Sequence, residues 1–94
     1  MSRRFDWDPA KNASNKRKHG VSFELATRVF GDPLLRSDIN RIVGEEERWL
    51  TIGAVGGVLL VVAHTYGVDD DGTEVIRIIS ARKAGPAERR RHEQ

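Results

Sequence analysis

Residues 48–66, RWLTIGAVGGVLLVVAHTY, contain the one long apolar run of this chain. The run is shorter than the roughly 20 residues that a membrane-spanning helix needs, and three glycines interrupt it. Segments rich in Val, Ile and Leu favour strands, and the Gly56-Gly57 pair between them is typical of a hairpin turn. The stretch therefore predicts two adjacent strands, residues 48–54 and 58–66, and no membrane span.

The sequence on either side of this hairpin predicts further strands. A strand is expected at residues 34–39, and the polar turn at residues 69–72 leads into another strand at residues 74–81. The alternation of apolar and polar side chains at residues 5–7 predicts a short strand near the N-terminus.

Three helices are also expected. Asp8 is a typical N-cap for a helix that starts at Pro9 and ends before Gly20. Ser22 caps a second, short helix with an apolar face, and a third helix runs from Pro86 to the end of the chain. Helices that are set apart from a run of antiparallel strands indicate an α+β domain. We therefore predict one domain over residues 1–94, with a short N-terminal strand, two helices, an antiparallel four-stranded sheet and a short C-terminal helix.

The composition excludes several classes of protein. A chain of 94 residues is one small domain, too short for separate cofactor and substrate domains. The absence of cysteine excludes a disulfide scaffold, a cysteine-based zinc site, an iron–sulfur cluster and a thiol nucleophile. The three histidines lack metal-ligand spacing, so no metal motif stands out. No apolar segment follows the charged N-terminus, which argues against a secretory signal and favours a cytoplasmic protein.

The net charge of +2 hides an uneven distribution. Residues 1–20 contain six basic and two acidic residues, residues 21–76 contain four and ten, and residues 77–94 contain six and two, which gives charges of +4, −6 and +4. Basic ends around an acidic middle indicate a polyanionic partner such as a nucleic acid. We expect the end of the first helix and the last strand to meet in one cationic cleft.

Candidate functional residues lie near the ends of the predicted elements. His19 ends the first helix, where it either caps the helix or exchanges a proton near neutral pH. His64 and Tyr66 share one face of their strand, because side chains alternate. The same alternation places Arg77 and Arg82 on opposite faces of the last strand. Arg77 lies in an apolar run, where it either forms an ion pair or binds a phosphate.

Short motifs over nearly the whole chain point together to one known family. They are FDWDPAK (5–11), KHGVSF (18–23), VFGDP (29–33), EERW (46–49), TIG (51–53), RIISARKA (77–84) and ERR (88–90). At this spacing the chain strongly resembles the BrnT family, toxins of bacterial type II toxin–antitoxin pairs. Where that family often has a tyrosine after the Glu-Arg-Arg run, this chain has His92, and the position of His64 also looks variable in the family.

The resemblance implies a fold like that of the RelE toxins, a ribonuclease activity that blocks translation, and no metal or other cofactor. It also implies a hetero-oligomer with an antitoxin that resembles BrnA, whose ribbon-helix-helix part binds operator DNA. Metal-free RNA cleavage uses the 2′-hydroxyl of the RNA as nucleophile, an acid and a base to move protons, and cations to stabilise the phosphate charge. We assign catalysis to His19, Arg77, Arg82, Lys18 and His64, and RNA binding to Lys11, Arg17, Tyr66, Lys83, Arg89 and Arg90.

Two other classes of protein fit the same sequence. The basic ends suit a nucleic-acid-binding module that does not cleave its ligand. The acidic middle suits a protein-interaction module that binds a basic partner, including an inactive toxin retained as a corepressor. Incubation with RNA in EDTA separates the enzyme from both alternatives.

Overall fold

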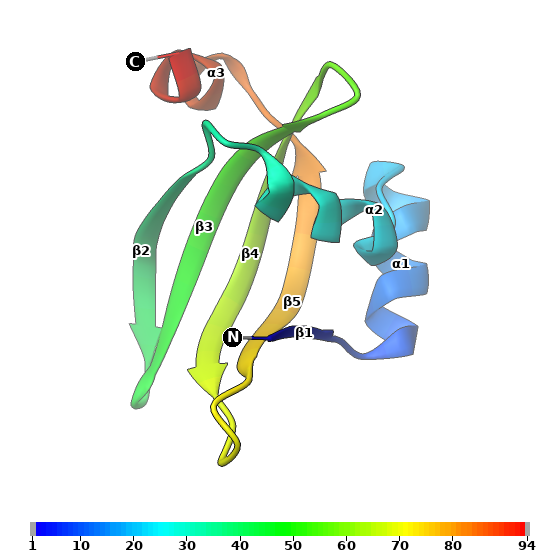
Figure 1. The fold of residues 1–94 in the computed structure, drawn as a ribbon. Helices are drawn as coiled ribbons and strands as arrows, with labels where there is room; N and C mark the ends of the chain where they lie inside the picture. The colour runs from blue at the N-terminus through cyan, green and yellow to red at the C-terminus, as the bar shows by residue number, and fades with distance from the viewer. Residues whose placement is uncertain (1, 94) are drawn as a thin grey trace.

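A computed structural model describes residues 2–93, which form a five-stranded sheet with helices packed on it (Figure 1). The strands lie in the order β1-β5-β4-β3-β2. The α+β class expected from the sequence is confirmed. The elements in chain order are β1 (Arg3–Asp6), α1 (Pro9–His19), α2 (Phe23–Ala26), the 3₁₀ helix η1 (Thr27–Gly31), β2 (Arg36–Val43), β3 (Glu46–Val55), β4 (Val58–Val68), β5 (Glu74–Lys83) and α3 (Pro86–Glu93).

The sheet differs from the expected four antiparallel strands. Strands β2 to β5 do form an antiparallel meander, but β1 adds a fifth strand. It pairs in parallel with the outer edge of β5, from Arg3 opposite Glu74 to Asp6 opposite Arg77. This pairing satisfies backbone groups of β5 that would otherwise form an open sheet edge.

The apolar run forms the predicted hairpin. Strands β3 and β4 meet at Gly56 and Gly57, whose φ angles of 56° and 81° match a two-residue turn that favours glycine. Within residues 2–93, no helix is long and apolar enough to cross a membrane. Strand β2 starts two residues later than expected and extends to Val43, while the predicted second helix changes to 3₁₀ geometry after Ala26.

Helix α1 is polar, and hydrogen bonds from its one buried residue, Asn15, attach it to the rest of the fold. Asp8 caps its start, and Gly20 ends it in the left-handed conformation, as predicted. The amide of Asn15 donates to the carbonyl oxygens of Val21 and Ala81 at 2.8 Å each, and its oxygen accepts from the backbone N–H of Ala81. These bonds attach α1 to β5 although the helix has almost no apolar side chains.

The two faces of the sheet are covered differently. Helices α1, α2 and η1 pack on one face, here called the helix face, and bury the main core there (Figure 1). Helix α3 lies at the far end of the sheet, where a smaller apolar cluster forms on the opposite face. The main core consists of Val21, Phe23, Ala26, Val29, Leu60, Val62, Ile76, Ile78 and Ala81, and the smaller cluster of Ile52, Val61 and Ala84.

Candidate nucleic-acid interface

A β-bulge decides where the arginines of β5 point. The register between β4 and β5 shifts by one residue at Ile79, so that Arg77 lies opposite Thr65 and Arg82 lies opposite Val61. Thr65 and Val61 are four residues apart in a regular strand and share a face. Their partners on β5 share that face too. The expectation that Arg77 and Arg82 point to opposite faces is therefore wrong, because the bulge adds one residue between them.

This face is the one that α1 and α2 leave uncovered. Val61 belongs to the small cluster on it, whereas its neighbours Leu60 and Val62 belong to the core under the helices. The strand pairings place three more arginines on the same side of β2 and β3. We call this surface the arginine face, and its arginines are Arg36, Arg41, Arg48, Arg77 and Arg82.

Two arginines face each other directly on this surface. Arg41 of β2 lies opposite Arg48 of β3, and like charges at opposed positions destabilise a sheet. The Nε of Arg48 is buried and lies 3.4 Å from Glu46 Oε1, an ion pair without hydrogen-bond geometry. A bound polyanion would relieve the repulsion between these two guanidinium groups.

The β5 arginines already hold carboxylates. Arg77 Nη1 lies 2.7 Å from Asp6 Oδ2, and both side chains are about half exposed. Arg82 binds Glu88 at two points, 2.9 and 3.2 Å long. Hydrogen bonds from Arg82 and from the Gly85 N–H lower the pKa of Glu88 to about 2, and the same carboxylate raises the pKa of Arg82. Each of the two arginines is thus already paired with a carboxylate of the protein itself, Asp6 for Arg77 and Glu88 for Arg82.

The basic residues of α1 lie elsewhere. Asn15 attaches α1 to Ala81 on the helix face, whereas Arg77 and Arg82 point to the opposite face. The expected single cationic cleft between the two chain ends therefore does not form. The candidates on α1, all exposed, are Lys11, Arg17, Lys18 and His19.

His64 is buried on the helix face of the sheet, below η1. Its Nε2 lies 2.7 Å from Thr51 Oγ1, and its ring packs edge-on against Phe30. Burial lowers the pKa of His64, so the neutral ring is favoured near pH 7. Tyr66 shares this face, as predicted, but is half exposed, and its hydrogen bond to Glu74 raises the pKa of its phenol.

The structure brings two of the RNA-binding candidates together. Lys83 and Arg89 line a hollow of about 510 Å³ between the β3–β4 hairpin and α3. His92 lines it too, and its Nε2 lies 2.9 Å from Asp32 Oδ2. Backbone N–H groups of Ala54 and Leu34, together with His92, lower the pKa of Asp32. His92 thus fastens α3 to the end of the sheet, while Arg90 is exposed on the same helix.

Metal ligands do not gather in the described part of the chain. No group of three or more His, Cys, Asp or Glu residues within residues 2–93 is placed to hold a metal ion. The polar turn after β4 instead satisfies its own backbone, since Asp71 Oδ1 accepts from the Thr73 N–H at 3.0 Å.

Comparison with known families identifies the family of the chain. A family profile described as the ribonuclease toxin, BrnT, of type II toxin-antitoxin system matches residues 7–88. The chain belongs to the BrnT family. No curated protein matches the chain. Membership in this family of ribonuclease toxins implies an antitoxin partner, and the BrnT match includes Arg77, Arg82 and Glu88.

Sequence reasoning missed part of this surface. Arg41 and Arg48 were not among the candidates, because the pairing between β2 and β3 that opposes them depends on a second bulge, after Ile39. Ser80 lies between Arg77 and Arg82 on the arginine face, and only the Ile79 bulge places it there. The sequence contains no signal for either bulge.

Proposed function

We propose that this BrnT protein is a metal-independent endoribonuclease that binds RNA on its arginine face and inhibits translation. The single observation that carries the proposal is the shared orientation of Arg77 and Arg82 across the Ile79 bulge. Guanidinium groups bind phosphate oxygens with two parallel hydrogen bonds. The partners of the two arginines on β4 are four residues apart, which is about 13 Å of strand at about 3.3 Å per residue, so the arginines can contact successive parts of one RNA strand.

The reaction is an attack of the RNA 2′-hydroxyl oxygen on the adjacent phosphorus. The bond from phosphorus to the 5′-oxygen breaks, a base takes the 2′ proton, and an acid supplies a proton to the leaving oxygen. The arginine that lies at the reacting phosphate, Arg77 or Arg82, stabilises its added negative charge, which is often the largest contribution to catalysis, and the other arginine holds a neighbouring phosphate of the same strand. For Arg82, the phosphate must first displace Glu88.

The groups that move protons are assigned less directly. From the sequence, His19 and Lys18 are the acid–base candidates, but both lie at the end of α1, which packs on the helix face, so we assign them a minor role in cleavage at the arginine face. His64 is buried and hydrogen-bonded, so we assign it a role in holding the sheet. Lys83 and Arg89 bind RNA at the hollow beside α3, and Arg90, exposed on the same helix, contributes a further positive charge. Lys11 and Arg17 guide RNA along α1, and Tyr66 stacks on a base.

The remaining proposals concern partners and location. The antitoxin is a BrnA-like ribbon-helix-helix protein, the complex is a hetero-oligomer, and it binds operator DNA through the antitoxin. The chain acts as one toxin domain with a RelE-like fold in the cytoplasm.

The test is incubation of the purified chain with RNA in EDTA. We expect cleavage products that end in a 2′,3′-cyclic phosphate, and little cleavage by the double variant Arg77→Ala/Arg82→Ala. Arg28→Ala is the matched control, because Arg28 is an exposed arginine of η1 outside the arginine face. RNA that is bound but stays intact at high protein excess indicates the alternative function, a nucleic-acid-binding module.

A further inference from the structure

A separate hollow of about 260 Å³ lies on the helix face, beside the part that α1 and α2 cover. Rings of Phe30, Trp49 and Tyr66 line it, and Arg3 and Ser37 also contribute. Its volume is slightly below the roughly 300–1,000 Å³ of typical small-molecule sites. The hollow is therefore large enough to hold one ring-shaped group.

A chain of hydrogen bonds runs from buried His64 through Thr51 to exposed Ser37, at one side of this hollow, and fixes the positions of its protons. The carbonyl oxygen of Thr65 can only accept, so His64 Nδ1 donates to it at 3.1 Å. Burial keeps the His64 ring neutral by lowering its pKa, so Nε2 accepts the hydroxyl proton of Thr51 at 2.7 Å. The Ser37 hydroxyl, 2.6 Å from Thr51 Oγ1, must then donate to Thr51. Ser37 consequently presents only lone pairs to the hollow.

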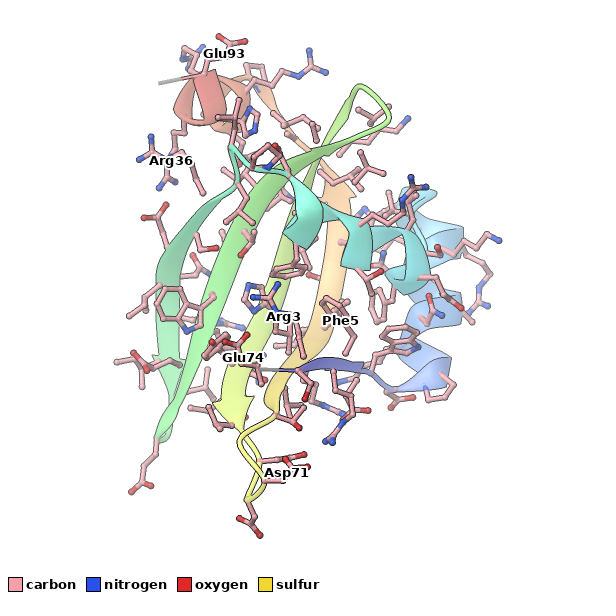
Figure 2. The ribbon with its side chains drawn as sticks, in the orientation of Figure 1. Arg3, Phe5, Arg36, Asp71, Glu74 and Glu93 are labelled. Atoms are coloured by element: carbon pink, nitrogen blue, oxygen red, sulfur yellow. The ribbon has the colours of Figure 1, made fainter. Side chains whose placement is uncertain are left out.

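These lone pairs restrict what can fill the hollow. A purely apolar side chain would bury the Ser37 oxygen without a donor, and an unsatisfied buried acceptor is costly. A nucleobase brings both a flat face for stacking on aromatic rings and an N–H group on its edge. Arg3 stands at the rim beside Glu74, to which its Nε is bound at 3.1 Å (Figure 2). For a nucleotide whose base fills the hollow, the Arg3 guanidinium places a positive charge near the phosphate.

We infer that this hollow is a nucleobase-binding site, with Trp49 and Tyr66 as stacking surfaces and Ser37 as the acceptor for a base N–H. The inference rests on the proposed function, because the base belongs to the RNA substrate. The site lies on the opposite side of the sheet from Arg77 and Arg82. Tyr66 also lines a second hollow that contains Arg77, where β3 and β4 diverge beyond the Trp49–His64 pair. The carboxylates of Asp6, Glu45, Glu46 and Glu47 line that second hollow as well, so it offers an RNA strand no purely cationic path between the two faces.

The test uses nuclear magnetic resonance of the labelled full chain with adenosine, guanosine, cytidine and uridine 5′-monophosphates, one at a time. The indole signal of Trp49 reports on the hollow, which Trp49 lines. The signal of Trp7 is an internal control, because Trp7 packs against Phe23 at a ring distance of 6.2 Å and does not line the hollow. We expect at least one nucleotide to shift the Trp49 indole signal in a saturable way and to leave Trp7 unchanged. Ser37→Ala should weaken this binding about threefold to tenfold, as expected for one hydrogen bond. Ser14→Ala, an exposed serine of α1, should not.

Each other outcome has a defined meaning. If no nucleotide at millimolar concentration moves the Trp49 signal, or if both tryptophans respond equally, the nucleobase site is wrong. If only a purified antitoxin moves it, the hollow binds a protein side chain, which also overturns the inference. RNA cleavage assayed on the same sample separates the two claims. Cleavage without a Trp49 response leaves the ribonuclease function standing, and a Trp49 response without cleavage leaves only the binding site.

Discussion

Arg77 and Arg82 project from the same face of β5 although five positions separate them. The extra residue at Ile79 makes this possible, because without it alternation would turn Arg82 toward the main core. Bulges re-aim side chains next to functional sites in many sheets. The bulge therefore links the local geometry of β5 to the ribonuclease function proposed for the arginine face.

The first prediction compares the two faces of the sheet in catalysis. Arg77→Ala and Arg82→Ala should each lower the rate of RNA cleavage by about 100-fold, which is typical for loss of a group that stabilises transition-state charge. His19→Ala should lower it less than tenfold, because α1 lies on the helix face. Rates are measured on one RNA under single-turnover conditions, and circular dichroism checks folding. A larger loss of cleavage rate for His19→Ala than for Arg82→Ala would show that the active site lies at the end of α1.

The second prediction concerns the ion pair that fastens α3. The pKa of Glu88 is about 2 in the folded protein, below its ordinary value of 4.5. The carboxylate therefore contributes stability above pH 4.5, and this contribution disappears as the pH falls toward 2. Thermal melts between pH 7 and pH 2 should show a smaller loss of stability on acidification in Glu88→Gln than in the unmodified chain. Glu93→Gln, on the same helix, serves as control, and an unchanged pH dependence in Glu88→Gln would argue against this role of the pair.

The third prediction concerns the attachment of α1 to β5. Asn15→Ala removes three hydrogen bonds and leaves buried backbone groups of Val21 and Ala81 without partners. We expect a loss of about 2–3 kcal/mol in the free energy of unfolding, which corresponds to a Tm lower by roughly 10–20 °C in a chain of this size. Urea unfolding of Asn15→Ala beside Ser14→Ala measures it. Equal stability of the two variants would show that apolar packing alone holds α1.

The fourth prediction concerns His64. Its folded-state pKa is lowered by burial, so the neutral ring stabilises the fold at and above the ordinary pKa of 6.5, and this stability is lost as the pH falls below that value. In a titration followed by nuclear magnetic resonance, the His64 ring should stay neutral at pH 6.5 and protonate only at lower pH. Half-protonation at or above pH 6.5 would contradict both the burial and the proton order along the chain from Ser37 to His64.

The sequence predicts where helices and strands begin and end better than it predicts which face of the sheet each side chain occupies. Asp8, Gly20 and the Gly56-Gly57 pair mark helix and hairpin boundaries because their chemistry is local. The parallel pairing of β1 with β5 has no local signal, since it joins residues about 70 positions apart.

The candidate site shows the same limit. Arg77 and Arg82 are found by charge and by family resemblance, but their common orientation depends on one bulge residue. The sequence also joins His64 to the catalytic set, whereas the fold buries it behind Thr51 and Phe30. Burial and register arise from pairing between distant segments, and residue type alone does not encode them.

The central claim is that RNA binds the arginine face. The most direct measurement is a chemical-shift map of the labelled chain with an RNA whose 2′-hydroxyls are replaced by 2′-O-methyl groups, which prevents cleavage. We predict the largest shifts at the backbone signals of Arg77, Ser80 and Arg82 and at the guanidinium signals of the two arginines. Shifts confined to the basic residues of α1 from Lys11 to His19, with the β5 signals unmoved, would contradict the account.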